Sequence, residues 1–431
     1  MKFAIIADDL TGSSDSGVQF ARRGLISSVL FNIETMNLEK MNADVVVVDT
    51  DSRGLKKEEA YQRVTRAAEK IKAFSFDHLY KKVDSTLRGN IGAEVDAVLE
   101  IIPKDFAIIA PAYPTIGRTT QNGEHYLNGK LIHETEISRD PKTPVLESNI
   151  EKLLHLQNNR QSATLTISDI LQGENHIENM LQQFKAEGIQ LVVADALEEE
   201  HLQMLVEGIL ATKYDVLWVG SAGLANHLVS VLGVTKESIN DNKLERKEEP
   251  VLVVAGSLSQ VTKGQIEYMK KQDDISAVEM NPTILFNQET RKVEMDKCAA
   301  KISEELNKGI NVVLHVGTSK EQIAGAMENG AKIGFTSTEV SNYIAQTLGE
   351  IVSTILGENA VAGLVLTGGD TAKAVSEQIG VSGMELIKEV ETGIPLGLLV
   401  GEKQIPAVTK AGAFGSEEAL YKSVKLLKGD E

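Results

Sequence analysis

Short runs of apolar residues alternate along this chain with segments in which apolar residues recur every three or four positions. The short runs are typical of strands buried on both faces of a sheet, and the longer segments are typical of the helices that cover it. In the first half we expect strands at FAIIA (3–7), VVVVD (45–49), LYKKV (79–83), FAIIA again (106–110), LVVAD (191–195) and VLWVG (216–220). The alternation predicts an α/β fold with mainly parallel sheets flanked by helices.

The helix between the third and fourth of these strands is the most clearly marked. Asn90 is placed to cap it and Pro103 to stop it. Its apolar positions share one helical face: Ile91, Val95, Val98 and Ile102.

A highly charged segment, TKESINDNKLERKEEP (235–250), interrupts the alternation and is typical of a linker. A second series follows, with strands expected in VLVVAGS (251–257), NVVLHVGTS (311–319), GLVLTGGD (363–370) and, as a pair around a tight turn, PLGLLVGEKQIPAVT (395–409). A long helix carries Val340, Ile344, Leu348, Ile351 and Ile355 on one face. The 431 residues exceed one ordinary core, so we expect two domains, residues 1–240 and 249–431.

Composition narrows the class of protein. The chain is 42% hydrophobic and 25% charged, as soluble globular proteins are, and its net charge of −18 opposes nonspecific binding to nucleic acid or to an anionic membrane. An anionic small substrate stays compatible with this charge if a few basic residues line a cleft. The single cysteine, Cys298, excludes a disulfide within the chain and fits a reducing compartment. No apolar segment suits a signal peptide or a membrane span, so we expect a cytoplasmic protein.

Several expected strands end in turns that carry more polar groups than a connection to a helix requires. In ADDLTGSSDSG (7–17), Asp8 and Asp9 directly follow an apolar strand, and similar turns lie at 220–223, 256–259, 317–319 and 368–371. Ligands of open α/β sheets bind outside the carboxyl ends of strands, where backbone N–H groups hold anions. One such turn is more often only a turn, and it is their number that favours a binding site.

In the first half, KKVDSTLRGN (81–90) combines Lys82, Asp84, Ser85 and Arg88 where a strand ends and a helix begins. Cations beside a carboxylate and a hydroxyl suit an anionic polyol, because the cations bind its carboxylate and the other groups hydrogen-bond to its alcohols. Taken by itself, this cluster is equally well explained as a set of surface ion pairs.

Two further stretches would add to such a site. DTDSRG (49–54) ends another strand with Asp49, Asp51 and Arg53, which would supply a second clamp. A long loop punctuated by proline and glycine, APAYPTIGRTTQNGEHYLNG (110–129), carries Arg118 as a candidate contact, and a solvated arginine is an equally good interpretation.

In the second half the strongest candidate is LVLTGGDTAKAV (364–375). Gly368 and Gly369 would let the backbone approach a phosphate, while Asp370 and Thr371 offer a carboxylate and a hydroxyl to a metal or a reacting alcohol. Asp370 could instead be an ordinary helix N-cap, although a cap would not require both glycines.

Familiar nucleotide and zinc motifs are absent. GEHYLNGKL (123–131) approaches a P-loop but has one residue too many between its glycines, and Leu131 stands where Ser or Thr is required. No G-x-G-x-x-G follows a strand, and the eight histidines form no H-x-x-x-H pair, so dinucleotide and zinc sites have no support.

Seven motifs together resemble the four-carbon acid sugar kinase family, in the family's order and over nearly the whole chain: ADDLTGSSDSG, KKVDSTLRGN, PAYPTIGRTTQNGEHYLNG, VGSAGLA, VVAGSLSQVTKGQIE, LTGGDTA and GLLVGEKQIPAVTKAGAFG. The resemblance implies phosphorylation of D-threonate, D-erythronate or 3-oxo-tetronate at O4 by ATP. It also implies an N-terminal sugar-acid-binding domain, a C-terminal nucleotide-binding domain and an active site in the interdomain cleft.

Carried over by motif, the resemblance implies two sets of contacts. Substrate contacts are expected at Asp9 in ADDLTG, Arg53 in DSRG and KVDS (Lys82, Val83, Asp84 and Ser85), to which the residues themselves add Asp8 and Arg88. ATP contacts are expected at Ser257 in AGSLS, GGDT (Gly368, Gly369, Asp370 and Thr371) and Gly401 in LVGE. Some relatives have Glu at the position of Asp370, a change that keeps the carboxylate.

For a kinase we assign neutralisation of developing charge to Mg²⁺, Lys82 and the helix N-terminus after Gly369, and proton removal to Asp370 or Asp9, with Asp370 favoured. The domains are expected to close across the linker. Two other functions stay open from the residues: a Schiff-base lyase or aldolase that uses Lys82, and a noncatalytic sugar-acid sensor. A homo-oligomer is also left open.

Overall fold

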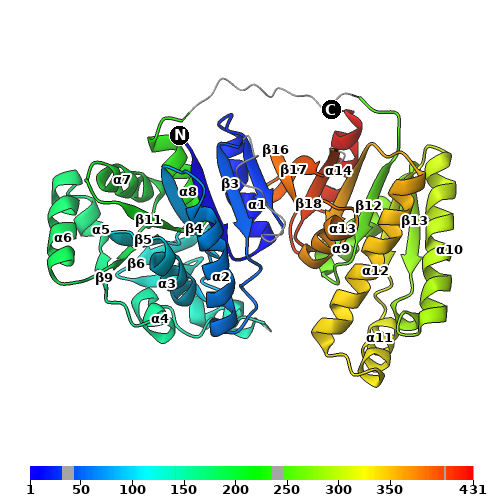
Figure 1. Cartoon of the computed structure of the whole chain (residues 1–431), viewed down its shortest axis with the longest axis horizontal. Helices are drawn as coiled ribbons and strands as arrows, with labels where there is room; N and C mark the ends of the chain where they lie inside the picture. Colours follow the sequence, from blue (N-terminus) through cyan, green and yellow to red (C-terminus); the bar gives the residue numbers. More distant parts are fainter. Residues whose placement is uncertain (32–42, 141, 235–245, 402–403, 431) are drawn as a thin grey trace. The chain divides into compact units, whose positions relative to one another are not determined.

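The computed structural model describes residues 1–31, 43–140, 142–234, 246–401 and 404–430. The chain divides into two compact units, Met1–Ser238 and Ile239–Glu431, each with its own set of strands (Figure 1). Most of the predicted linker, residues 235–245, and residues 402–403 of the predicted tight turn lie outside the described residues.

The first unit is built on a parallel sheet. Its strands are β1 (Phe3–Ala7), β2 (Ser27–Leu30), β3 (Val45–Asp49), β4 (His78–Lys82), β5 (Phe106–Ala110), β9 (Ser162–Leu165), β10 (Leu191–Ala194) and β11 (Val216–Gly220). They lie in the order β2-β3-β1-β4-β11-β5-β10-β9, and each listed neighbour pairs in parallel. All six strands predicted in this half are confirmed, and β2 and β9 are additional.

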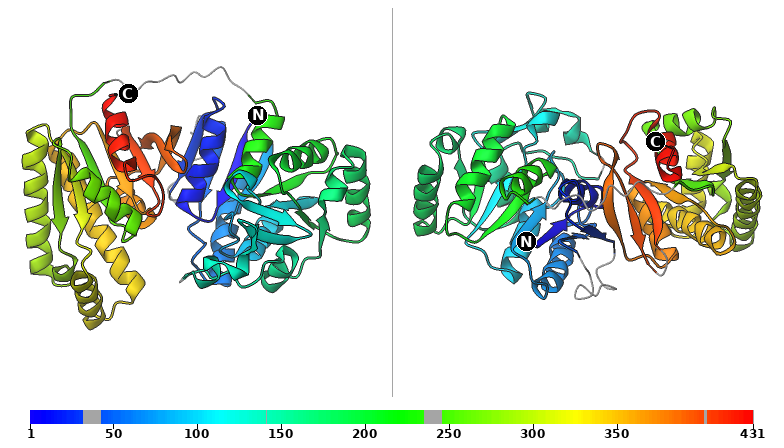
Figure 2. Two further views of the ribbon diagram at one scale, coloured as in Figure 1. Left: turned by 180° about the vertical axis from the view of Figure 1, so that it is seen from behind. Right: turned by 90° about the horizontal axis from the view of Figure 1, so that it is seen from above.

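Helices cover both faces of this sheet (Figure 2). They are α1 (Leu10–Ala21), α2 (Lys57–Lys72), α3 (Ile91–Ile101), α4 (Ile150–Gln157), α5 (Ile167–Ile170), α6 (Glu174–Ala186), α7 (Glu199–Leu210) and α8 (Ala222–Val231). Side chains alternate across β1, so that Ala4 and Ile6 join the core under α2 and α3, whereas Phe3 packs edge-on against Phe20 of α1 at 4.7 Å between ring centroids. Burial on both faces explains the unbroken apolar runs.

The predicted helix after β4 is present as α3, with its predicted apolar face buried. Asn90 precedes it but does not cap it: its side-chain amide donates to the carbonyl oxygens of Leu55, at 2.9 Å, and Ser52, at 3.4 Å. The long loop after β5 folds into a small antiparallel sheet of β6 (Arg118–Gln121), β7 (Glu124–Leu127) and β8 (Lys130–Leu131).

The second unit has a mixed sheet. Its strands are β12 (Val251–Ala255), β13 (Ile275–Met280), β14 (Asn311–Val316), β15 (Gly363–Thr367), β16 (Gly383–Glu391), β17 (Ile394–Val400) and β18 (Ile405–Lys410), in the order β13-β14-β12-β15-β18-β17-β16. The first five in this order are parallel, and β17 runs antiparallel to both β18 and β16. The predicted strand pair is therefore confirmed as β17 and β18.

Helices cover this sheet too: α9 (Gln260–Met269), α10 (Gln288–Asn307), α11 (Lys320–Lys332), α12 (Ser337–Glu358), α13 (Gly369–Gln378) and α14 (Ala419–Lys428). On one face α9 and α14 pack on a core that includes Val253, Val365 and Val408. The predicted long helix is α12, where Val340, Leu348, Ile351 and Ile355 are buried and Ile344 is half-buried.

Candidate active site

Three polar turns of the first unit leave the same edge of its sheet. In the strand register, Ala7 at the end of β1 lies opposite both Asp49 at the end of β3 and Lys82 at the end of β4. The carboxyl ends of these parallel strands therefore bring Asp8, Arg53 and Asp84 together, as the clustering of polar turns predicts.

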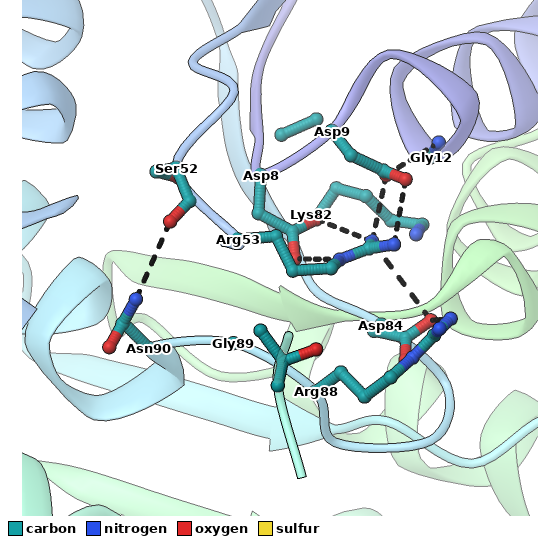
Figure 3. A network of polar contacts seen from close by, with 12 residues as sticks. Asp8, Asp9, Gly12, Ser52, Arg53, Lys82, Asp84, Arg88, Gly89 and Asn90 are labelled. Carbon is teal, nitrogen blue, oxygen red and sulfur yellow. Dashed lines mark hydrogen bonds and ion pairs between the residues drawn. The ribbon is translucent and has the colours of Figure 1, made fainter. Parts of the chain in front are cut away.

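Arg53 is the centre of this group (Figure 3). Its Nε lies 2.7 Å from Asp8 Oδ2 and its Nη2 lies 2.9 Å from Asp8 Oδ1. The same guanidinium reaches Asp9 through Nη1 and Nη2, both at 2.7 Å, and lies 3.9 Å from Asp84 Oδ1. We call Asp8, Asp9, Arg53, Lys82, Asp84 and Arg88 the Arg53 cluster.

Asp9 also caps the following helix. Its Oδ1 accepts a hydrogen bond of 2.8 Å from the backbone N–H of Gly12, which fixes the start of α1. A Cβ at Gly12 would lie 2.7 Å from Lys82 Nζ and 2.6 Å from Asp9 Oδ1. Glycine at this position thus lets the ammonium and the carboxylate approach the helix N-terminus together.

Asp84 is held by a second arginine. Arg88 Nε lies 2.7 Å from Asp84 Oδ2, and the hydroxyl of Thr86 donates to the same oxygen. Arg88 Nη1 lies 3.5 Å from Asp140, a residue that the sequence interpretation did not include.

Burial and neighbouring charges shift the pKa values of the three carboxylates in different directions. Burial alone would raise the pKa of Asp8, but the charge and hydrogen bonds of Arg53 outweigh burial and hold that pKa below its ordinary value. Burial likewise opposes ionisation of Asp84, and Arg53 and Arg88 again lower its pKa. The pKa of Asp9 is raised, because burial and the charges of Asp8 and Asp84 exceed the effect of Arg53 and Lys82. Asp9 is therefore the carboxyl of this cluster that accepts a proton most readily.

A buried ion pair beneath the cluster was not predicted. Lys81 Nζ lies 2.7 Å from Glu94 Oε2 of α3, and Ser52 Oγ donates to Glu94 Oε1 at 2.9 Å. Lys81 Nζ also donates to the carbonyl oxygen of Lys82 at 2.8 Å. Because adjacent strand residues point to opposite faces, Lys81 supports the fold from below while Lys82 faces α1. The sequence feature that could have predicted this ion pair is Glu94, an acidic residue on the apolar face of α3.

The small sheet contributes groups to the same region. His125 is fully buried between Thr120 Oγ1, 3.0 Å from its Nδ1, and the carbonyl oxygen of Ser85, 2.9 Å from its Nε2. Burial lowers the pKa of His125 to about 4, so the ring is neutral near pH 7. The Nε of Arg118 is buried with no hydrogen-bond partner among the described residues.

Other candidates of the first unit lie apart from the cluster or do not present a side chain to it. Val83 packs in the apolar core, and its backbone N–H donates to Gly220 at 2.9 Å. Asp51 is exposed and lies 3.4 Å from Arg63. Asp49 Oδ1 accepts from the backbone N–H of Asp51 at 2.9 Å. The acidic residues of DTDSRG therefore shape the turn that carries Arg53.

In the second unit, four strand ends surround a cavity of about 340 Å³. Ala255 of β12 lies opposite His315 of β14 and Thr367 of β15, and Thr367 lies opposite Lys410 of β18. One part of the lining is polar or glycine: Gly256, Ser257, Gly317, Ser341, Gly368, Gly369, Asp370, Thr371 and Gly412. The rest is apolar: Leu258, Pro282, Val316, Ile323, Ala326, Met327, Ile344 and Ala345. A glycine-rich end suits phosphates, and an apolar end suits a nucleotide base.

The glycines of this cavity permit close contacts. A Cβ at Gly256 would lie 2.1 Å from Thr371 Oγ1, and a Cβ at Gly412 would lie 2.1 Å from Ser257 Oγ. Gly368 has φ of +105°, a conformation that side chains rarely adopt. Gly368 is itself the N-cap residue of α13, so the alternative interpretation of Asp370 as an N-cap is wrong: Asp370 lies in the first turn and is exposed.

Gly401 lies apart from this cavity. It follows β17, which runs antiparallel to β18 and therefore ends at the opposite edge of the sheet. A Cβ at Gly401 would lie 3.2 Å from the carbonyl oxygen of Gly380. The glycine that the same motif places on the cavity is Gly412, which sequence reasoning missed although it follows the other strand of the pair.

Comparison with known proteins matches both units. A family described as the sugar-binding N-terminal domain matches residues 3–228, and one described as the nucleotide-binding C-terminal domain matches residues 252–420. A D-threonate kinase of Salmonella typhimurium is 33% identical over all of both chains. The chain belongs to the four-carbon acid sugar kinase family.

Other members of the family are similar over nearly their full length. A D-erythronate kinase of Heliobacterium modesticaldum is 30% identical, covering 98% of this chain and 96% of its own. A 3-oxo-tetronate kinase of Actinobacillus succinogenes is 27% identical, covering 97% and 98%. A solved Haemophilus influenzae structure has a TM-score of 0.78 at 25% identity, covering 97% of this chain and 98% of its own. Membership of this family supports a kinase rather than either alternative, the Schiff-base lyase or the noncatalytic sugar-acid sensor.

Two kinds of feature are absent from the part of the chain that the structure describes. No group of three or more His, Cys, Asp or Glu side chains there is arranged to hold a metal ion. None of the helices there combines the length and apolar character needed to span a bilayer.

Proposed function

We propose that this kinase transfers the γ-phosphoryl group of ATP to the 4-hydroxyl of a four-carbon sugar acid such as D-threonate, D-erythronate or 3-oxo-tetronate. Residues 1–240 would bind the acid and residues 249–431 the nucleotide. The observation that carries the proposal is that one chain of this family contains both features: an ionic cluster around Arg53 in its first unit and a glycine-lined cavity in its second.

The Arg53 cluster supports binding of an acid that also carries hydroxyls. Arg53, Lys82 and Arg88 supply cationic donors for a carboxylate, and Asp8 and Asp84, held ionised, accept hydrogen bonds from alcohols. Ser85 adds a hydroxyl beside them. Because ion pairs with neighbouring residues hold Arg53, Arg88, Asp8 and Asp84, the substrate meets an ordered set of donors and acceptors.

The cavity supports binding of ATP. Its apolar lining, which includes Met327 and Ile344, suits the base. The turns at Ser257, Gly368 and Gly412 suit the phosphates, since backbone N–H groups in a glycine-rich lining can approach them closely. The N-terminus of α13 adds a partial positive charge at Gly369.

Proton removal from the acceptor hydroxyl is assigned to Asp370, the one carboxylate among the described residues that line the cavity. Lys82 would neutralise charge that develops on the transferred group. The proposal keeps the predicted closure of the two domains during turnover, because the acceptor oxygen must reach phosphorus.

A magnesium ion bound together with the nucleotide is compatible with this lining. Mg²⁺ bound with a nucleotide is held mostly by phosphate oxygens and water, with few protein ligands, so the lining needs to supply no carboxylate cage. The hydroxyl of Thr371 is the protein oxygen that we assign to hold it, since the carboxylate of Asp370 is assigned to proton removal. When bound, the ion would supply charge neutralisation at the phosphates.

The test is ADP release from ATP and Mg²⁺ by the purified full chain against D-threonate, D-erythronate, L-threonate, L-erythronate and 3-oxo-tetronates, with product analysis to locate the phosphate. We expect turnover with at least one acid and phosphorylation at O4. Binding of ATP without turnover on any acid would overturn the substrate class, and absence of ATP binding would overturn the kinase assignment.

A further inference from the structure

Lys410, the last residue of β18, is a buried cation that the proposed reaction does not use directly. It is 3% exposed, and its Nζ donates to Thr262 Oγ1 at 3.3 Å and to the carbonyl oxygens of Ala411, Gly412 and Phe414 at 2.9, 3.1 and 3.2 Å. No carboxylate of the described residues forms an ion pair with it. All of its partners are neutral oxygens.

The same residue connects two turns that line the cavity. Its backbone carbonyl accepts a 2.9 Å hydrogen bond from the N–H of Gly368, and its ammonium holds the carbonyl of Gly412. Thr262 of α9 strengthens the second turn, because its hydroxyl donates to the Gly412 carbonyl at 2.8 Å. Movement of Lys410 would therefore displace both sides of the glycine-lined cavity.

Burying an ammonium among neutral groups opposes its charged form. Desolvation lowers the pKa of Lys410 to about 8. Carbonyl dipoles satisfy its three N–H donors without cancelling its charge, so the site lacks an anion. Polyphosphate bound between the Gly368 and Gly412 turns would provide one at close range, in a region where water screens poorly.

We propose that Lys410 is a positioning residue for the nucleotide phosphates, which holds the Gly368 and Gly412 turns in place and supplies a buried positive charge behind them. This inference rests on the proposed binding of ATP in this cavity. It predicts that the contribution of Lys410 grows with the number of phosphates on the ligand, whereas a lysine that only anchors a loop would affect all ligands of the cavity alike.

The experiment measures dissociation constants of adenosine, ADP and ATP by calorimetry for the full chain, with Lys410→Met, Lys410→Arg and the control Lys332→Met. Lys332 is an exposed lysine of α11, paired with Glu328, in the same unit. For Lys410→Met we expect ATP binding to weaken about tenfold or more and adenosine binding to change little. Lys332→Met should bind all three ligands as the unaltered protein does.

A pH series gives a second readout that needs no Met variant. Between pH 7.5 and 9.5 the unaltered protein should lose ATP affinity as Lys410 deprotonates, while Lys410→Arg should not, because arginine stays charged. The groups that contact the ammonium from α9 and from the loop after β18 do not titrate, and neither does Thr367, its neighbour on β15.

The possible outcomes distinguish failure of the proposed nucleotide site from failure of the proposed role of Lys410. If the unaltered protein binds no ATP, the proposed nucleotide site fails. If it binds ATP but Lys410→Met weakens adenosine and ATP equally, or the pH series is flat, the role of Lys410 is wrong and the nucleotide site stands. If Lys410→Met does not fold, as judged by circular dichroism, the comparison of Lys410→Arg with the unaltered protein across pH decides alone.

Discussion

The guanidinium of Arg53 and the carboxylate of Asp8 form a two-point ion pair, with Nε 2.7 Å from Oδ2 and Nη2 2.9 Å from Oδ1. The backbone reinforces it, since the N–H groups of Ser52 and Arg53 donate to the carbonyl oxygen of Asp8 at 2.9 and 3.1 Å. Two residues 45 positions apart are thus fixed both by side chain and by main chain. The planar fork of arginine is what allows one group to serve Asp8 and Asp9 together.

Arg53→Lys tests whether this fork matters for the acid substrate. Lysine keeps the charge but not the paired donors, so Asp8 and Asp9 lose their fixed orientation. We expect kcat/KM for the sugar acid to fall about 100-fold and ATP affinity to stay unchanged. Arg63→Lys, on a half-buried arginine outside the Arg53 cluster that pairs with Asp51, is the matched control. Equal activity of the two variants would contradict the role of Arg53.

Gly412→Ala and Gly401→Ala separate two glycines of one motif. A Cβ at Gly412 would lie 2.1 Å from Ser257 Oγ, so alanine must push that side chain away from its place on the cavity. We expect the dissociation constant of ATP to rise about tenfold for Gly412→Ala and to change little for Gly401→Ala. Weaker ATP binding by Gly401→Ala alone would return Gly401 to the nucleotide site.

His125 makes the stability of the first unit depend on pH. Its pKa is about 4 when folded, against about 6.5 when unfolded, so between these values the unfolded chain binds a proton that the folded chain does not. Stability is fully present above about pH 6.5 and falls as pH drops toward 4, by up to about 3 kcal/mol from this residue.

Urea unfolding at several pH values checks this prediction. Trp218, the single tryptophan, is buried in β11 and reports on the first unit by fluorescence. Glutamine at position 125 cannot gain this proton, so the difference in unfolding free energy between the unaltered protein and His125→Gln should shrink as pH is lowered from 7 to 4.5. A difference that is constant with pH would show that His125 does not titrate in this way.

The sequence predicted the strands that form the central part of each sheet. Unbroken apolar runs such as Val45–Asp49 are typical of strands that are buried on both faces. It missed β16, where Glu385, Lys388 and Glu391 interrupt the apolar residues. The hairpin strands after β5 were missed for a similar reason: their residues are mostly polar and read as a loop.

For the candidate site, sequence patterns located strand ends but not the pairs formed across them. The proximity of Arg53 to Asp8 depends on β3 lying beside β1, a matter of strand order that no local spacing encodes. Gly401 and Gly412 illustrate the same limit: both glycines follow strands of one motif, and the reversed direction of β17 puts only Gly412 on the cavity. Lys81 read as an ordinary strand residue because its partner, Glu94, lies on another element.

Asp370→Asn and Asp9→Asn test the assignment of the catalytic base. Asparagine keeps the size of the side chain and one acceptor oxygen but cannot accept the proton, so Asp370→Asn should lower kcat about 100-fold or more with little change in the KM of the sugar acid. The Mg²⁺ concentration for half-maximal rate should stay the same, because a base, unlike a metal ligand, does not contribute to ion affinity.

Asp9→Asn should act differently, since Asp9 caps α1 and pairs with Arg53: we expect the KM of the sugar acid to rise more than kcat falls. The raised pKa of Asp9 gives the two assignments distinct pH signatures. If Asp9 were the base, kcat would decline at acidic pH with a midpoint above the ordinary aspartate value, and Asp9→Asn would abolish that decline. Near-normal turnover by Asp370→Asn together with that behaviour would transfer the role to Asp9, whereas an increased Mg²⁺ requirement in Asp370→Asn would make Asp370 a ligand of the ion.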